Sequence, residues 1–434
     1  MPIKARLIRL LNLREGEGVA VAAGVGMFFL LFCSYFMLRP VRETMGVAGG
    51  VDNLQWLFTG TFVVTLIAMP LFGWVASRAP RRHILSWTYS FFVVNLLAFA
   101  VVWWLQADIV WTGRVFYIWL SVFNLMAISL AWSVLADVFA GEQARRLFAL
   151  IAGGASLGGL AGPLLGALLV EPLGHSGLLV LASALLAASA GCAAWLHHWR
   201  DRHPDEAEDA TDRVERHRPL GGNPFAGVTE VLCSRYLLGI ALFVTLLASV
   251  NTFMYFEQAR MVAEHFPDRT RQTQVFGLID AVVQGLAILT QVFFTGRIAQ
   301  RLGVRVLLTG VPLLLVAGFL WLAWSPVFAV FVVVMVARRA GEYALVRPGR
   351  EMLYTVLPSE QKYKAKNFND TVVYRGGDAV SGWVKRGVDL IADQPSLALL
   401  LGAMIALAWA FTGAWLARQY RRWEPGAGKH GQSV

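Results

Sequence analysis

Charged residues are scarce in this chain of 434 residues, because Asp, Glu, Lys and Arg together make up only 15% of it. Ordinary soluble domains hold about 25%. Cysteine is scarcer, since only Cys33, Cys192 and Cys233 are present and none has Cys-x-x-Cys spacing. The cysteines therefore predict neither a disulfide framework nor a zinc site. A dinucleotide fingerprint, a Ser/His/Asp triad and a set of metal ligands are also lacking, so we expect no cofactor, no metal and no enzymatic activity.

Hydrophobic residues are abundant instead. They form 57% of the chain, the mean hydropathy is +0.56, and many runs reach the roughly 20 apolar residues that a membrane-spanning helix needs. The net charge of +10 is explained by Lys and Arg gathering in cytoplasmic loops, so no nucleic-acid partner is expected. The sequence predicts an all-α polytopic membrane protein in contact with a lipid bilayer.

Twelve membrane-spanning helices are expected. With that number, seven clusters of Lys and Arg all fall on one side of the membrane, which identifies it as the cytoplasmic side and places both termini there. We expect a six-helix bundle over residues 1–199, a charged, Pro-containing cytoplasmic linker over 200–236, and a second six-helix bundle over 237–434. The expected spans are Gly18–Leu38, Gln55–Ala76, Ile84–Leu105, Val115–Phe139, Leu147–Val170, Gly177–Trp199, Leu237–Val262, Val275–Ala299, Val306–Ser325, Val327–Tyr354, Asn367–Ala392 and Ser396–Ala417.

The tenth and eleventh spans carry charges that lipid tolerates poorly. Each Arg, Lys or Asp at the centre of a bilayer costs roughly 2.5–3.5 kcal/mol. In the eleventh span the polar residues recur every three or four positions, which places them on one face of a helix. We therefore expect these two spans to line a water-filled, cationic cavity. The polar face of the eleventh span consists of Asp370, Thr371, Arg375, Asp378, Gly382, Lys385 and Asp389.

The two halves of the chain repeat each other at an offset of 218 residues, as in the step from residue 142 to residue 360. Two parallel six-helix halves with both termini in the cytoplasm are the architecture of the major facilitator superfamily, in which the substrate binds near the membrane midplane between the halves. The pairs at this offset are Glu142-Gln143 with Glu360-Gln361, Arg42 with Arg260, and Asn124 with Glu342.

The loops after the second and eighth spans also match each other. Gly73 to Arg78 corresponds to Gly296 to Arg301, and both resemble the loop motif of that superfamily without the Asp that usually precedes the first Arg. Asp137, near the inner end of the fourth span, is a further candidate, or else simply holds Arg145 or Arg146. The residues expected to act in gating are Arg78, Arg82, Asp137, Arg301 and Arg305.

The first span ends in charges that share one helical face, because Arg39, Arg42 and Glu43 lie three and four residues apart. Pro40 is expected to break the helix beside them, and freed backbone groups at membrane depth favour a position next to a cavity. The alternative is that these residues are loop charges outside the membrane.

Acidic residues in other spans complete the candidate site. Asp280, in the eighth span, is the strongest of them, because carboxylates within a membrane usually face a pathway or a basic partner. A structural salt bridge between helices is the alternative interpretation. Glu257 and Arg260 of the seventh span correspond to the charges of the first span. In the fifth span, Gly154, Gly158 and their neighbours at four-residue spacing predict close helix packing, since no Gly-Lys-Ser/Thr follows them.

Three segments resemble the ATP/ADP (nucleotide) antiporters of plastids and intracellular bacteria: Leu38 to Gly46, Trp132 to Phe148 with the Gly-rich helix after it, and Arg350 to Lys366. The resemblance implies a major-facilitator-like fold and exchange of NTP for NDP, or of related phosphorylated solutes, across a bacterial inner membrane. Those antiporters usually show Arg-x-x-Lys-Asp where this chain has Arg39-Pro-Val-Arg42-Glu43. Lys and Arg are not equivalent at a phosphate site, so the cargo can differ.

We expect a secondary transporter that moves an anionic, nucleotide or phosphorylated solute, with ATP and ADP as candidates, by alternating access and as a monomer. The alternatives are a proton-coupled porter of another solute, such as a drug or lipid, and a membrane scaffold without transport. Tyr343, Tyr354 and Tyr374 are candidates for stacking a base or sugar, or else pack in the core. The predicted binding residues are Arg39, Arg42, Glu43, Asn124, Glu257, Arg260, Asp280, Arg338, Arg339, Glu342, Tyr343, Arg347, Arg350, Arg375, Asp378 and Lys385.

Overall fold

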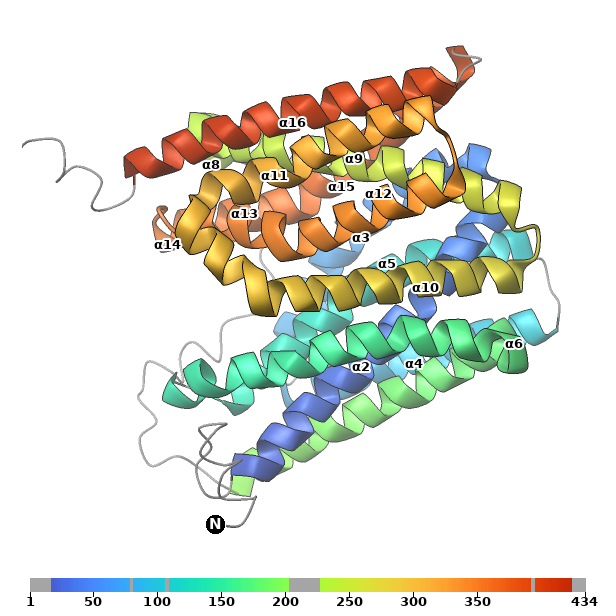
Figure 1. The fold of residues 1–434 in the computed structure, drawn as a ribbon. Helices are drawn as coiled ribbons and strands as arrows, with labels where there is room; N and C mark the ends of the chain where they lie inside the picture. Colours follow the sequence, from blue (N-terminus) through green and yellow to red (C-terminus); the bar gives the residue numbers. More distant parts are fainter. Residues whose placement is uncertain are drawn as a thin grey trace, which may run out of the picture. The chain divides into compact units, whose positions relative to one another are not determined.

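The computed structural model describes residues 17–78, 81–105, 109–139, 141–202, 227–391 and 395–423, and the regular elements in these ranges are helices (Figure 1). The N-terminal basic cluster and most of the expected linker lie outside the described residues. The α-helices are α2 (Glu17–Ala48), α3 (Leu54–Arg78), α4 (Arg81–Trp104), α5 (Ile109–Val138), α6 (Gly141–Arg202), α8 (Val228–Cys233), α9 (Arg235–His265), α10 (Arg269–Thr290), α11 (Gly296–Trp324), α12 (Phe328–Gly341), α13 (Arg347–Leu353), α14 (Ser359–Phe368), α15 (Tyr374–Ile391) and α16 (Pro395–Trp423).

Four short segments depart from the α-helical hydrogen-bonding pattern. The 3₁₀ turn η1 (Val51–Asn53) precedes α3. Three π-helical turns interrupt longer helices: η2 (Gln291–Thr295) joins α10 to α11, η3 (Glu342–Val346) joins α12 to α13, and η4 (Asn369–Val373) joins α14 to α15. The expected tenth and eleventh spans are therefore helical, but each contains a π turn that the residue pattern did not predict.

Eight helical segments among the described residues are long and apolar enough to cross a membrane. Two of them, Arg146–Arg202 and Arg269–Trp324, have 57 and 56 residues and each includes two of the expected spans. Each also contains one glycine in the left-handed region, Gly174 at φ 65° and Gly303 at φ 71°. Because only glycine adopts that conformation at little cost, these two positions mark where one span ends and the next begins. The predicted all-α polytopic membrane fold is confirmed.

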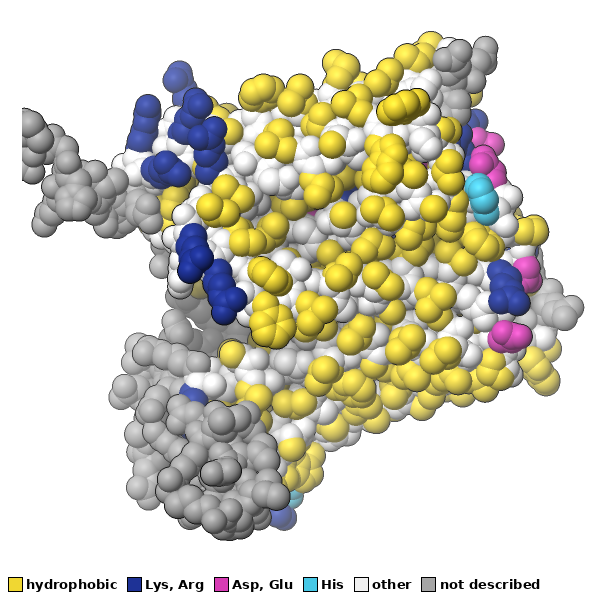
Figure 2. All heavy atoms as spheres, in the orientation of Figure 1, with side chains coloured by type: hydrophobic (Ala, Val, Ile, Leu, Met, Phe, Trp, Pro, Cys, Tyr) yellow, Lys and Arg dark blue, Asp and Glu magenta, His cyan; other side chains and the backbone are white. Residues whose placement is uncertain are grey.

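Hydrophobic side chains cover the outward side of α16 in the face drawn in Figure 2, and Lys and Arg side chains gather where that helix ends. The last turn of α16 contains Arg421 and Arg422. An apolar length followed by terminal arginines is the pattern of a helix that crosses the hydrocarbon and ends in the headgroup region.

The chain forms two compact units, and neither is continuous in sequence. The first unit comprises residues 1–49, 71–221 and 266–281, and the second comprises residues 50–70, 222–265 and 282–434. Each unit has its own hydrophobic core, the first built mainly from α2, α4, α5 and α6 and the second from α9, α11, α12 and α16. Each unit also takes in a segment from the other half of the sequence. The expected division of the chain around residues 200–236 stays a prediction.

In the first unit, α2 packs along α6 at backbone contact. A Cβ atom added at Gly154 would lie 2.4 Å from the carbonyl oxygen of Val25, and one added at Gly158 would lie 2.3 Å from that of Phe29. Both distances are far below van der Waals contact, so only glycine fits at these positions. The glycines of the fifth span therefore serve close helix packing, as their spacing predicted.

In the second unit, α15 has the amphipathic character that its sequence predicted, with the polar side turned inward. Asp378 and Lys385 are buried, whereas Val380, Leu390 and Ile391 on the opposite side are exposed. This arrangement is the reverse of a helix on a soluble protein and suits a helix with lipid outside and polar groups inside.

Helix α2 continues through Pro40 to Ala48, so the expected break at this proline is wrong. Proline removes one backbone donor from the helix interior, and helices in membranes tolerate this where neighbouring groups compensate. The carbonyl that loses its N–H partner is that of Phe36, four residues earlier, and the helix keeps its form on both sides of this one missing bond. Arg39, Arg42 and Glu43 therefore lie within a helix and not in a loop.

Candidate functional site

The first unit contains a compact charged cluster on α2. Arg42 lies 2.6 Å from the carboxylate of Glu43, and Arg39 lies 3.9 Å from it. Asp280 of α10, which is only 3% exposed, lies 3.6 Å from the Arg39 guanidinium. The predicted cations Arg39 and Arg42 thus lie beside the predicted carboxylates of Glu43 and Asp280, and the net charge of this cluster is zero.

Helix α5 supplies the remaining contacts of this cluster. Arg42 donates a hydrogen bond of 3.3 Å to the Ser121 hydroxyl, and its guanidinium lies 4.7 Å from the centre of the Tyr117 ring. A guanidinium held over an aromatic ring is stabilised electrostatically and loses freedom of orientation. The sequence analysis missed both contacts, although Tyr117 and Ser121 share one face of the fourth span with the predicted residue Asn124.

The second unit contains a buried polar network around Arg338 of α12. This side chain donates hydrogen bonds to the amide oxygen of Asn251 and, over 3.3 Å, to the carboxylate of Glu342. The Asn251 amide in turn donates to the Tyr374 hydroxyl over 3.2 Å. The network joins α9, α12, η3 and α15. Asn251 was missed, although a single asparagine in the middle of an apolar run was a signal that pointed to it.

The carboxylate of Asp378 belongs to the same region. It accepts a hydrogen bond of 3.2 Å from the Thr252 hydroxyl and lies 3.8 Å from Arg375. Arg339 is buried beside Arg338. Arg338, Arg339 and Lys385 therefore point into the protein and not toward lipid, as the sequence predicted.

A second group of charges in this unit lies on α13, η4 and the residues beside them. Arg350 is 3.0 Å from the carboxylate of Asp370, and Arg347, although exposed, is close enough to act electrostatically on that carboxylate. The Arg347 guanidinium lies 4.5 Å from the centre of the Tyr343 ring. Here two arginines converge on one acid.

Three arginines of the second unit have a buried Nε donor that is not satisfied. The Nε atoms of Arg260, Arg338 and Arg350 have no hydrogen-bond partner among the described residues. Each of these arginines pairs with one carboxylate through an Nη atom, Arg260 with Glu257, Arg338 with Glu342 and Arg350 with Asp370, so Nε is the donor that is left over. Burying a hydrogen-bond donor without an acceptor costs about 1–3 kcal/mol of stability, and more when the donor group is charged.

The remaining predicted binding residues have different surroundings. Lys385 pairs with Asp389 one turn away on α15. The side-chain oxygen of Asn124 is buried and has no hydrogen-bond partner among the described residues. Tyr354 is fully buried and accepts a hydrogen bond of 2.9 Å from Asn369. Of the three tyrosines, Tyr343 lies over a guanidinium, while the buried Tyr354 and the half-buried Tyr374 are hydrogen-bonded to amide groups.

The expected gating residues lie at helix ends. Arg78 is exposed and its guanidinium lies 4.1 Å from the centre of the Trp74 ring. Arg301 and Arg305 are exposed on either side of the left-handed Gly303. Asp137 lies in the last turn of α5, and the Arg82 side chain lies outside the described residues. Their role in gating stays a prediction.

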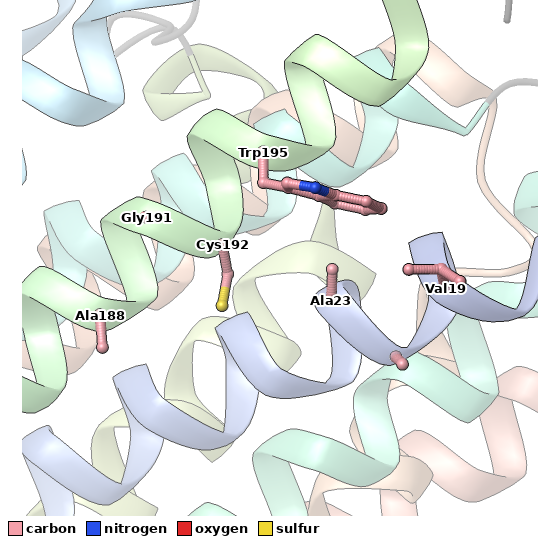
Figure 3. A pocket seen from close by; sticks show the side chains of 7 residues that line it. Val19, Ala23, Ala188, Gly191, Cys192 and Trp195 are labelled. Atoms are coloured by element: carbon pink, nitrogen blue, oxygen red, sulfur yellow. The ribbon is translucent and has the colours of Figure 1, made fainter.

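A shallow hollow in the first unit is apolar. It is lined by side chains of α2 and α6, and Figure 3 shows Trp195 and Cys192 of α6 opposite Val19 and Ala23 of α2. Its walls contain no charged side chain, so they offer an anionic solute no partner. The charged clusters, and not this hollow, are the candidate site.

The family of the chain follows from comparison with known proteins. A model of the Major Facilitator Superfamily matches residues 24–348, which is most of the chain and includes the charged residues of α2 as well as Asn251, Arg338 and Glu342. The chain belongs to the Major Facilitator Superfamily. The comparison of its sequence with curated proteins finds no match.

Solved structures of superfamily transporters share this fold over nearly their whole length. The nucleoside transporter NupG has a TM-score of 0.58 at 14% identity, with 92% of this chain and 98% of that chain covered. A bacterial homologue of the human lysosomal transporter Spinster has a TM-score of 0.57 at 14% identity, covering 94% of this chain and 97% of its own. The human organic anion transporter MFSD10 (TETRAN) has a TM-score of 0.57 at 17% identity, covering 92% and 100%.

At these identities the likeness shows the fold and not the substrate. Membership of the superfamily makes the chain a multi-pass secondary transporter of small molecules. The ATP/ADP antiporter resemblance and the identity of the cargo are taken up below as proposals.

Proposed function

We propose that this transporter moves an anionic solute of the nucleotide or phosphorylated-metabolite class across the bacterial inner membrane by alternating access, in exchange for a second anion. The observation that carries this proposal is the set of buried Nε donors of Arg260, Arg338 and Arg350, which have no acceptor among the described residues. Phosphate and carboxylate oxygens are the acceptors that arginine binds best, because the planar guanidinium presents parallel N–H groups to them. An anion would satisfy donors that the protein leaves open.

The balance of charge in the second unit supports the same conclusion. Among its described residues, seven cations are predicted to bind substrate, and five carboxylates are predicted with them or paired with them, which leaves a surplus of two positive charges. The cations are Arg260, Arg338, Arg339, Arg347, Arg350, Arg375 and Lys385, and the carboxylates are Glu257, Glu342, Asp370, Asp378 and Asp389. The buried members of this set, Arg338, Arg339 and Lys385 against Glu257, Glu342 and Asp378, balance each other, so the surplus belongs to arginines that are partly exposed and that an anion can reach.

Counterflow in proteoliposomes tests the proposal. Vesicles loaded with unlabelled ATP, ADP or inorganic phosphate are diluted into the same labelled anion, with uncharged adenosine as the comparison. We expect accumulation of at least one anion and weaker accumulation of adenosine. Transport of adenosine in preference to every anion, or no anion transport at all, would overturn the proposal.

Variants connect the transport to the arginines. Arg347→Gln removes an exposed cation of the cluster without opening a cavity, and Arg338→Lys keeps the buried charge while removing the guanidinium fork. Both are expected to lower anion counterflow at least tenfold. Arg421→Gln, at the end of α16, is the matched control and should leave counterflow unchanged.

A proton-coupled porter is the second candidate, because one specific pair favours it. Asp280 is almost fully buried against Arg39, and a carboxylate in such a place can exchange a proton for an ion pair as the site opens. Uptake driven by a pH gradient into vesicles that contain no internal anion would support this candidate over exchange.

A further inference from the structure

The π turns η2 and η3 are joined to each other by side-chain hydrogen bonds. Gln291, the first residue of η2, donates from its amide to the carbonyl of Tyr343 over 3.0 Å. Thr295, the last residue of η2, donates from its hydroxyl to the carbonyl of Ala344 over 2.8 Å, which is shorter than its distance of 3.2 Å to the carbonyl of Thr290 in its own helix. Both acceptors lie inside η3, so two side chains of one π turn bind the backbone of the other.

These hydrogen bonds hold the backbone where its own pattern is irregular. In η3 the N–H of Arg347 bonds the carbonyl of Glu342, five residues earlier, in place of the usual four. A turn of this kind takes up one extra residue and is rare unless neighbouring groups stabilise it. Donors from Gln291 and Thr295 satisfy carbonyls at the point where the helical pattern changes.

The extra residue changes which side chains share a face. A straight α-helix turns by about 100° per residue, so twelve residues would place Arg350 about 120° away from Arg338 around the axis. Because η3 takes up one extra residue, the rotation around the helix axis between the two arginines is about 100° smaller. Their side chains therefore leave the axis in directions about 20° apart. The contacts agree with this, since the side chains of Arg338 and Arg350 are only 7% and 13% exposed, and Arg350 meets Asp370 of η4.

We propose that Gln291 and Thr295 are positioning residues for the anion site: by holding η3 in its π form they align Arg350 with Arg338 on one face of the α12–η3–α13 helix. This inference rests on the proposed function for the role of the two arginines, but the alignment itself can be measured without transport. Neither Gln291 nor Thr295 is a predicted binding residue, and both lie outside the charged clusters.

The alignment is tested by cross-linking in a background in which Cys33, Cys192 and Cys233 are replaced by serine. Arg350→Cys and Asp370→Cys are introduced together and treated with a short bifunctional methanethiosulfonate reagent. We expect efficient cross-linking with the native residues at 291 and 295, and a loss of at least fivefold with Gln291→Met and Thr295→Val combined. Unchanged cross-linking would overturn the inference, whatever the transport assay shows.

The matched control is Thr309→Val on α11. The Thr309 hydroxyl also donates a bond of 2.8 Å to a backbone carbonyl, that of Arg305, but within its own helix. Its removal should leave the cross-link unchanged. Thr295→Ser, which keeps the hydroxyl, should restore the cross-link that Thr295→Val loses. A loss in Thr309→Val equal to that in Thr295→Val would mean that any threonine of this helix acts in the same way, and would contradict the positioning role.

Counterflow of labelled ADP supplies the functional readout. We expect Thr295→Val to raise KM about tenfold while the maximal rate changes less than about twofold, because the site is misaligned but the transport cycle is intact. In an Arg350→Gln background the same substitution should have no further effect on KM. An equal increase in both backgrounds would overturn the positioning role, whereas a wild-type protein that moves no anion, with cross-linking as expected, would overturn only the proposed function.

Discussion

Gln143 and Gln361 make the same kind of contact in the two halves of the chain. Gln143 donates a hydrogen bond of 3.3 Å to Glu17, at the start of α2, and Gln361 donates one of 3.1 Å to Glu230, in the short helix before α9. The two glutamines lie 218 residues apart (361 − 143), which is the offset of the internal repeat. Each therefore ties a helix with basic residues near its start to the beginning of its own half.

The two contacts differ in strength, because only Glu17 also binds a cation, with Arg146 at 2.7 Å. Glu17→Gln is expected to lower the stability by roughly 1–3 kcal/mol, the range for hydrogen bonds to charged groups. Glu230→Gln, which weakens one amide-to-carboxylate hydrogen bond and breaks no ion pair at hydrogen-bond distance, should cost less, about 1 kcal/mol. Thermal unfolding of the purified variants in detergent measures both, and an equal loss in the two would contradict the assignment.

Gly158→Ala is expected to destabilise the first unit, because the new methyl group would meet the Phe29 carbonyl oxygen at 2.3 Å. Overpacking of this kind costs about 1–3 kcal/mol. The matched control is Gly153→Ala on the same helix, where nothing lies within 4 Å of the added Cβ. There, the better helix propensity of alanine should leave the melting temperature unchanged or raise it. The prediction fails if both variants melt alike.

Asp280→Asn is expected to reduce transport at least tenfold with the fold intact. The substitution removes the carboxylate charge 3.6 Å from Arg39 but keeps the shape of the side chain. Arg39 is then left beside the carboxylate of Glu43, at 3.9 Å, which Arg42 already engages. Counterflow rates across a range of pH test this, with Asp268→Asn, in the exposed segment before α10, as the control. Unchanged rates would mean that the Asp280–Arg39 pair only stabilises the packing of α10 against α2.

His175, at the bend between the expected fifth and sixth spans, predicts a pH dependence of stability. The hydroxyls of Thr44 and Thr273 share a hydrogen bond of 2.7 Å, and a second hydrogen bond of 3.0 Å joins the Thr273 hydroxyl to the His175 Nε2 atom. Burial, assisted by the charge of Arg269 and opposed by Asp268, lowers the pKa of His175 from 6.5 to about 4. The folded protein therefore keeps this ring neutral.

The unfolded chain binds a proton at His175 below about pH 6.5, whereas the folded chain does so only near pH 4. The unfolded state thus holds more protons in this window, and stability must fall as the pH is lowered through it. The melting temperature of the wild type should decline more steeply from pH 6.5 to 4 than that of His175→Gln. Parallel curves for the two proteins would show that this histidine does not contribute.

The fold was largely predictable because its signals are local. The apolar runs predicted the helices, and the three- to four-residue period of the eleventh span predicted that Asp378 and Lys385 would face inward. The expected break at Pro40 was wrong because a proline costs one hydrogen bond, which is small beside the cost of exposing a whole turn of backbone in a membrane.

The details of the site were less predictable, since they depend on residues distant in sequence. The partner of Arg338 is Asn251, 87 residues away, and no periodicity within either helix indicates that pairing. The π turns follow the same rule. Nothing in the segment Glu342–Val346 distinguishes it from ordinary helix, and the donors that hold it lie on η2.

The inward-facing polar side of α15 has a consequence for how the protein is made. A segment that contains Arg375, Asp378, Lys385 and Asp389 is too polar to leave the translocation machinery for lipid by itself. Its charges can enter the bilayer only when partners such as Thr252 on α9 are already in place to receive them. Assembly of the second unit must then follow an order. Helix α9 is inserted first, and α15, which is synthesised more than a hundred residues later, packs against it afterwards.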